Sequence, residues 1–162
     1  MALMVRMVNK AKWDMNYNPA NADAITLCLK TKNNTLSFWV VESAEKVEDG
    51  VLAIASANQN LDAIDIVVVE SQEFEARNIK IIETVGRTAC EDLAKSHRDL
   101  AELNVRHLEG VSEVIASKIK DNKVVRYNMS ALRKLIEDAI CEKRINLDLL
   151  HDGIKRKLSV QV

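Results

Sequence analysis

The first half of the chain alternates short apolar runs with helical patterns of apolar and polar residues. The run IDIVVV at 64–69 is β-branched and almost wholly apolar, which predicts a strand buried on both faces. The runs at 24–31 and 35–42 are joined through Asn33-Asn34, and asparagine tolerates the positive φ of tight turns, so these runs predict a β-hairpin. The same reasoning predicts helices at 43–58 and 71–77 and a further strand at 79–84.

The second half of the chain, after Gly86, has a helical pattern. Apolar residues recur there every three or four positions, which is the spacing of one face of a helix. The predicted helices are 89–103, 108–121, 130–143 and 147–158, with a short run at 123–126 able to add an edge strand. The Asn-rich segment 13–23 is predicted to be a loop that follows an N-terminal strand or arm.

These elements define an α/β fold class. The N-terminal β-hairpin is antiparallel, whereas the later strands are connected through helical crossovers and are expected to be parallel, so the predicted sheet is mixed. We expect the front half, 1–86, to form this sheet and the back half, 87–162, to be a mainly helical continuation. A length of 162 residues fits a single domain, 1–162.

Composition excludes several classes of protein. Four Gly and one Pro rule out collagen-like and Gly/Pro-rich disordered chains. Cys28, Cys90 and Cys141 form no close pair in sequence, so neither a disulfide scaffold nor a Cys-rich zinc module is indicated. No apolar run approaches the roughly 18 residues of a membrane span, and basic residues interrupt the N-terminal segment. We therefore expect a cytoplasmic protein without a membrane segment.

Charge is distributed unevenly along the chain, although the net charge is only −1. Residues 1–32 carry a net +3, residues 33–117 a net −9 and residues 118–162 a net +5. The acidic middle can pair with the basic ends inside the fold, or the basic C-terminal segment can form a face for an acidic partner. Nucleic acid is an unlikely partner, because the isoelectric point is about 6.3 and the aromatic residues do not alternate with the basic ones.

The segment from Glu83 to Cys90 contains the candidate anion-binding residues Gly86, Arg87 and Thr88. A predicted strand passes there through a glycine into a predicted helix, whose first backbone N–H groups can bind an anion, and the Arg87 guanidinium can add a bidentate contact. The alternative is structural. Thr88 and Glu91 match a capping box, in which Glu91 would satisfy the same N–H groups.

Two further groups are candidates for chemistry. Cys90 falls in the predicted first helical turn, where the helix dipole and Arg87 can lower a thiol pKa, although a buried inert cysteine is the alternative. Glu70 and Glu83 follow two neighbouring predicted strands, and carboxylates at the carboxyl ends of parallel strands can hold a metal ion or act as an acid. Their spacing has no signature value, so the sequence assigns no metal site, no catalytic residue and no cofactor.

Residues 97–104, HRDLAELN, match the pattern of the protein-kinase catalytic loop. The resemblance to that family covers these eight residues only, and the Gly-rich loop, the strand lysine and the metal-binding DFG segment that the kinase loop works with have no counterpart in the sequence. The segment also continues an amphipathic helical pattern. We therefore assign no kinase role to His97, Asp99 or Asn104.

Two functions remain compatible with these patterns. The first is a non-enzymatic interaction or regulatory protein, with a protein partner or a homo-oligomer formed through the helical half, whose four apolar stripes and basic surplus suggest a docking surface. The second is a small hydrolase or transferase that binds a phosphate- or carboxylate-bearing substrate at Gly86, Arg87 and Thr88, with Glu70 or Glu83 as metal ligand or base. A ligand-sized cleft favours the second, and a broad apolar patch favours the first.

Overall fold

The computed structural model describes residues 2–13 and 22–159 and has the predicted α/β class. One six-stranded sheet forms its centre, in the spatial order β4-β5-β2-β1-β3-β6, and every neighbouring pair is antiparallel. The strands are β1 (Leu3–Val8), β2 (Leu36–Val41), β3 (Ile64–Glu70), β4 (Lys80–Glu83), β5 (His97–Ala101) and β6 (Val124–Tyr127).

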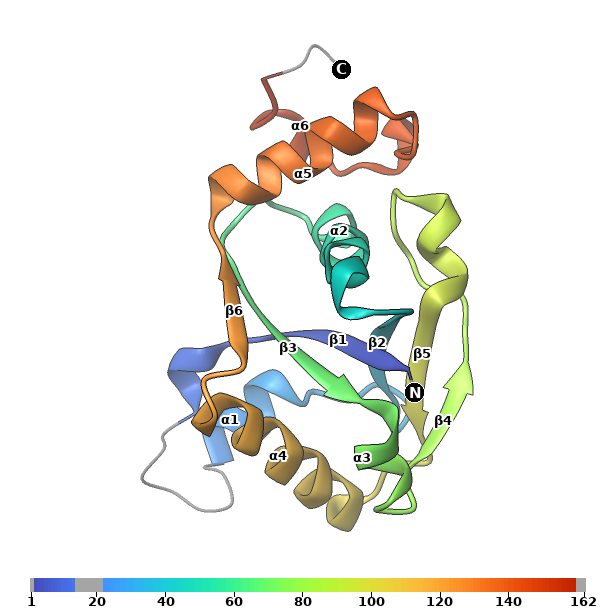
Figure 1. The fold of residues 1–162 in the computed structure, drawn as a ribbon, viewed down its shortest axis with the longest axis vertical. Coiled ribbons are helices and arrows are strands. Elements are labelled where there is room, and N and C mark those ends of the chain that lie inside the picture. Colours follow the sequence, from blue (N-terminus) through green and yellow to red (C-terminus); the bar gives the residue numbers. More distant parts are fainter. Residues whose placement is uncertain (1, 14–21, 160–162) are drawn as a thin grey trace.

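Helices cover both faces of the sheet (Figure 1). One face packs against α2 (Val47–Ala57), α5 (Met129–Cys141) and α6 (Asp152–Lys155), and the other against α1 (Ala22–Cys28), α3 (Ser71–Glu75) and α4 (Val105–Lys120). Short 3₁₀ helices complete the fold: η1 (Lys10–Lys12), η2 (Ala44–Lys46), η3 (Glu91–Ser96) and η4 (Leu147–Leu149).

The central strand β3 confirms the prediction made from IDIVVV. Its side chains alternate between two hydrophobic clusters, with Ile66 in the cluster under α2 and α5 and Val67 in the cluster under α4. Both residues have no solvent exposure. Such burial on both faces explains why the run is apolar throughout rather than alternating.

The predicted β-hairpin is wrong in its first arm, which forms helix α1. Ala24 and Cys28 are four residues apart and both are buried, so the apolar pattern of this run serves one face of a helix. The turn itself exists, because Asn33 and Asn34 have φ values of 54° and 57° and are flanked by a single bridge from Lys32 to Thr35. β2 instead pairs with β1 and β5.

The predicted parallel pairing of the later strands is also wrong. β2 and β3 are connected through α2, but each pairs antiparallel with β1, which therefore lies between them. The prediction assumed that strands joined by a helix become neighbours, whereas the N-terminal strand takes the place between them. β4, after the five-residue α3, pairs with β5 at the edge of the sheet.

The second half has fewer helical residues than predicted. α4 and α5 confirm two of the helices, and β6 confirms the edge strand near 123–126. The predicted helix 89–103 is wrong, because it divides into η3 and β5, and the kinase-like His97–Ala101 is thus a strand paired with β2 and β4. The predicted helix 147–158 is reduced to η4 and the four-residue α6. The predicted loop 13–23 lies mostly outside the described residues.

The uneven charge is largely neutralised inside the fold. Basic side chains of the C-terminal segment form ion pairs with acidic side chains of the middle segment: Lys118 with Glu73, Arg126 with Asp65, Arg144 with Asp49 and Asp92, and Lys157 with Asp62. Arg144 bridges α2 and η3, with its Nη2 atom 2.9 Å from Asp49 and 3.0 Å from Asp92. The C-terminal basic surplus therefore serves intramolecular pairing to a large extent.

Across residues 2–13 and 22–159, no helix has both the length and the apolar character needed to cross a bilayer.

Candidate functional site

A cavity lies beside the turn that the sequence analysis singled out. Its volume is about 800 Å³, and we call it the turn cavity. The lining comes from four segments: the end of α2 with the loop after it (56–59), the turn 86–89, η3, and the segment 148–155. Gly86, Arg87 and Thr88 thus come together at a ligand-sized cavity, as the anion-site prediction requires.

Gly86 has a steric role in this turn. A Cβ atom placed there would lie 2.3 Å from Cη2 of Trp39 and 2.8 Å from Cβ of His97. Its backbone N–H donates to the carbonyl of Ala94 at 2.9 Å, which fixes the turn against η3. The glycine is therefore required by close packing against β2 and β5.

Thr88 is buried and ties the turn to α2. Its Oγ1 atom lies 2.7 Å from Oγ of Ser56 and accepts a hydrogen bond from the backbone N–H of Cys90 at 3.2 Å. The proposed capping box with Glu91 does not form, because η3 has Cys90 as its N-cap and Glu91 accepts instead from the amide of Asn146. The predicted long helix is absent as well, so helix N–H groups give little support to an anion at this turn.

Arg87 is exposed at the cavity, with no hydrogen bond or ion pair to any described residue. The second cation of the lining is Lys155, whose Nζ atom forms an ion pair with Oδ1 of Asp152 at 3.8 Å. Together with Glu91 and Asp148, the lining carries two basic and three acidic side chains. A polyanion would meet net repulsion there, which disfavours the multiply charged phosphates of the original prediction.

The Cys90 thiol is not activated. Its Sγ donates to Oδ1 of Asp92 at 2.9 Å, and the side chain is buried. Burial raises the pKa of Cys90 to about 12, and the Asp92 carboxylate acts in the same direction, against the opposing effect of Arg144. Of the two alternatives for Cys90, the structure therefore agrees with the buried cysteine and not with the lowered pKa, because the neighbouring charge is an acid and the thiol is withdrawn from water.

His97 contacts the turn from β5. Its Nδ1 atom lies 2.6 Å from the hydroxyl of Thr84, and its ring meets Trp39 edge to face at 4.9 Å between centroids. Burial lowers the pKa of His97. The side chain is a hydrogen-bonded part of the packing around Gly86.

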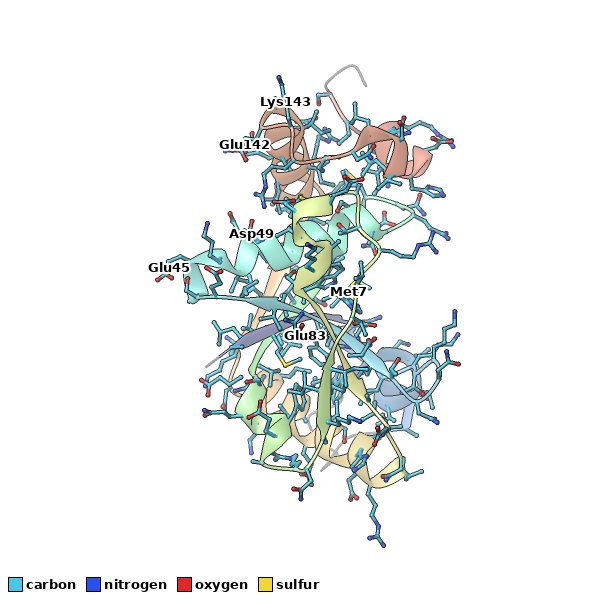
Figure 2. The ribbon with its side chains drawn as sticks, turned by 90° about the vertical axis from the view of Figure 1, so that its right-hand side faces the viewer. Met7, Glu45, Asp49, Glu83, Glu142 and Lys143 are labelled. Carbon is cyan, nitrogen blue, oxygen red and sulfur yellow. The ribbon has the colours of Figure 1, made fainter. Side chains whose placement is uncertain are left out.

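Glu70 and Glu83 do not share a site. Glu70 caps α3 in a reciprocal capping box with Glu73, and Glu83 on β4 forms an ion pair with Arg98 at 2.8 Å (Figure 2). Three strands separate β3 from β4, which corresponds to roughly 19 Å at the usual spacing of strands. No group of three His, Cys, Asp or Glu side chains in the described part of the chain is arranged to hold a metal ion.

Sequence reasoning missed a second cavity, of about 430 Å³, which we call the Arg6 cavity. It lies where β1 leaves β2, because their pairing covers only residues 3–5 of β1. Beyond that point Arg6 fills the gap, with Nη1 donating to the carbonyl of Ser37 at 2.5 Å and Nη2 to that of Cys28 at 2.8 Å. The signal in the sequence is a single charged residue inside the apolar run LMVRMV.

Comparisons of the chain with protein-family models, with curated proteins and with solved structures find no match.

Proposed function

We propose that this protein is a non-enzymatic binding protein that holds a small carboxylate-bearing molecule in the turn cavity. The observation that carries the proposal is the cavity itself, with the unpaired Arg87 guanidinium at its wall. A volume of about 800 Å³ is typical of sites for small molecules. The alternative, a hydrolase or transferase at the same turn, has less support from the geometry.

The side chains considered for catalysis are engaged in structural contacts. The Cys90 thiol donates to Asp92 and stays protonated at neutral pH, the Glu83 carboxylate pairs with Arg98, and Glu70 caps α3. A nucleophile needs an adjacent base and a low enough pKa, and Cys90 has a raised pKa instead. These contacts favour binding over covalent chemistry.

The charges of the cavity suggest a ligand with both an acidic and a basic group. After the pairing of Lys155 with Asp152, the charged groups left for a ligand are Arg87, Asp148 and Glu91, of which Glu91 already accepts a hydrogen bond from the amide of Asn146. A guanidinium suits a carboxylate, and the Asp148 carboxylate suits an ammonium group. We therefore infer a small zwitterion rather than a phosphate ester.

The apolar stripes that suggested a partner surface in the helical half are used inside the chain. Those of α4 and α5 belong to the two hydrophobic clusters that flank the sheet, through Val111, Ile115 and Ile119 and through Leu132, Ile136 and Ala139. The original reason for self-association through these helices therefore no longer applies. All three cysteines are unpaired, which fits the reducing cytoplasm that we propose as the location.

The proposal is tested by NMR titration of the backbone amides of residues 86–89. The probes are 4-aminobutyrate, butyrate and inorganic phosphate. We expect saturable shifts with 4-aminobutyrate, weaker binding of butyrate, and at least a tenfold loss for Arg87→Ala, since a hydrogen bond to a charged group contributes about 1.5–3 kcal/mol.

Two variants control for other causes. Arg106→Ala removes an exposed arginine from α4, which packs on the opposite face of the sheet, and should leave the titration unchanged. Ala57→Trp places a bulky side chain at an exposed position of the cavity wall and should block binding without changing its charge. Absence of saturable shifts at 86–89 with all three probes would refute the proposal, as would binding that survives Ala57→Trp.

A further inference from the structure

Arg6 is a partly buried cation of the sheet, and it forms no ion pair with any residue that the structure describes. A guanidinium has five N–H groups, and the carbonyls of Ser37 and Cys28 use two of them. The Nε atom is buried and has no acceptor among the described residues. The ring of Phe38, 5.5 Å from the guanidinium carbon, is the other near contact. Three of the five donors thus remain for a further acceptor.

The acidic groups nearest to this cation are committed to other contacts. Asp65 accepts from Arg126 through Oδ1 at 3.0 Å and from the backbone N–H of Lys10 through Oδ2 at 3.2 Å. Asp99 accepts from the hydroxyl of Ser37 at 2.9 Å. Burial lowers the pKa of Arg6 to about 10, which still leaves it charged at neutral pH. Asp99 offsets part of this effect from a distance, but it forms no ion pair with the guanidinium, so an incoming anion would relieve the remaining cost of taking the charge out of water.

The Arg6 cavity combines this cation with an apolar wall. Its charged lining consists of Arg6, Arg126 and Asp65, which sum to a formal charge of +1. Five of the other seven lining residues are apolar: Met7, Val8, Leu27, Ala63 and Ile64. Two of these are solvent-exposed large hydrophobic residues, Leu27 at 59% and Met7 at 43% (Figure 2). An apolar group placed there would remove both from water.

We propose that the Arg6 cavity binds a short-chain monocarboxylate, with its carboxylate at Arg6 and Arg126 and its alkyl tail against Leu27 and Met7. A single negative charge balances the formal +1 of the lining, and the planar carboxylate matches the fork of the guanidinium. A volume of about 430 Å³ suits a short tail. The site is separate from the turn cavity and does not depend on the function proposed there.

Arg6 also has a structural role, since it bonds two backbone carbonyls where β1 leaves β2. That role explains the position of the guanidinium but supplies no negative charge, and it does not explain the second arginine of the lining or the exposed apolar pair. The ligand role is therefore tested with variants that leave Arg6 in place.

The test uses isothermal titration calorimetry of the full chain with hexanoate. Acetate has the charged head without the tail, hexanol has the tail without the charge, and inorganic phosphate is a different anion. We expect hexanoate to bind at least tenfold more tightly than acetate and hexanol. Equal binding of hexanoate and hexanol would overturn the proposal, and so would binding of phosphate as tight as that of hexanoate.

Two variants locate the site. Leu27→Asp puts a carboxylate at the exposed mouth of the cavity and should weaken hexanoate binding at least tenfold by repulsion. Its matched control is Val105→Asp, at an exposed position in the first turn of α4, which should bind hexanoate as the original chain does. Arg126→Gln should weaken hexanoate but not hexanol. Equal affinities of Leu27→Asp and Val105→Asp would show that hexanoate binds elsewhere and would refute the assignment.

Discussion

The turn cavity and the Arg6 cavity place an arginine in opposite environments. Arg87 is exposed and lines a large cavity of mixed charge, whereas Arg6 is held inside the sheet by two carbonyls and faces a smaller cavity with a net positive charge. At the turn, the glycine and the threonine are needed for packing, and the arginine is left for a ligand. Where β1 leaves β2, Arg6 alone bonds the backbone carbonyls and also lines the cavity proposed for a ligand. Whether an arginine is available to a ligand thus depends on the contacts that its side chain already makes within the fold.

The largest expected effect in this comparison is that of Gly86→Ala, which tests the structural half of the turn. Its Cβ would lie 2.3 Å from Trp39 and within 3 Å of His97, and the Trp39 ring belongs to the hydrophobic cluster under α2, so it cannot move without disturbing that cluster. We expect destabilisation of about 3 kcal/mol, measured by chemical denaturation. An unchanged free energy of unfolding would mean that Gly86 is present for flexibility, as in the original anion-site interpretation.

The next prediction compares the two arginines directly. Arg6→Ala removes two hydrogen bonds and leaves the carbonyls of Ser37 and Cys28 without these donors, so it should destabilise the fold by about 2 kcal/mol. Arg87→Ala should change the free energy of unfolding by less than about 0.5 kcal/mol, as is usual for an exposed side chain without contacts. Denaturation curves of the two variants measure the difference. Equal losses of unfolding free energy in the two variants would contradict the different structural roles of Arg6 and Arg87.

A smaller effect is expected from Thr88→Val, which keeps the shape of the side chain and removes its hydroxyl. The buried Ser56 hydroxyl and the N–H of Cys90 would each lose a partner, at a cost of about 1–2 kcal/mol. Thermal unfolding provides the measurement. If the variant is destabilised while 4-aminobutyrate still binds, Thr88 is structural and Arg87 alone contacts the ligand.

The smallest effect concerns the reactivity of Cys90 near the turn cavity. The pKa of about 12 keeps this thiol protonated in the folded chain, so a disulfide reagent at pH 8 should label the exposed Cys141 first and Cys90 only on unfolding. Because the folded pKa exceeds the unfolded value of about 8.5, the thiol stabilises the fold below that pH. This contribution is lost as the pH rises toward 12. Fast labelling of Cys90 at pH 8 would contradict the assigned environment.

The apolar spacing along the chain predicted the elements whose secondary structure does not depend on a distant strand. The strand IDIVVV, the helices α2, α4 and α5, and the edge strand β6 follow from apolar spacing alone. What the sequence did not predict depends on distant partners. β5 forms a strand instead of part of a helix because β2 and β4 flank it, and β1, predicted as an N-terminal strand or arm, is central because it enters between β2 and β3. When the apolar residues of a short segment fit both the helical and the strand period, the sequence alone does not show which distant strand the segment pairs with.

The same limit applies to the candidate site. The sequence identified the turn that lines the turn cavity and named Gly86 and Thr88 as candidates for anion binding beside a structural alternative. It could not show the contacts with Trp39 and Ser56, because these come from elements far along the chain. It separated Glu70 from Glu83 by one predicted strand step, whereas the sheet order places three strands between them. Arg6 was used only as a charge in the N-terminal segment, since its burial follows from the position of β1.

The most direct test of the difference between the two arginines is the NMR signal of each Nε–H group during a hexanoate titration. The Nε–H of Arg6 is buried without an acceptor, so the account predicts a slowly exchanging signal that moves saturably as hexanoate binds. The exposed Nε–H of Arg87 should exchange fast and respond to hexanoate only at concentrations well above those that saturate the Arg6 signal. A rapidly exchanging Arg6 signal that hexanoate does not move, or a saturable response at Arg87 instead, would contradict the account.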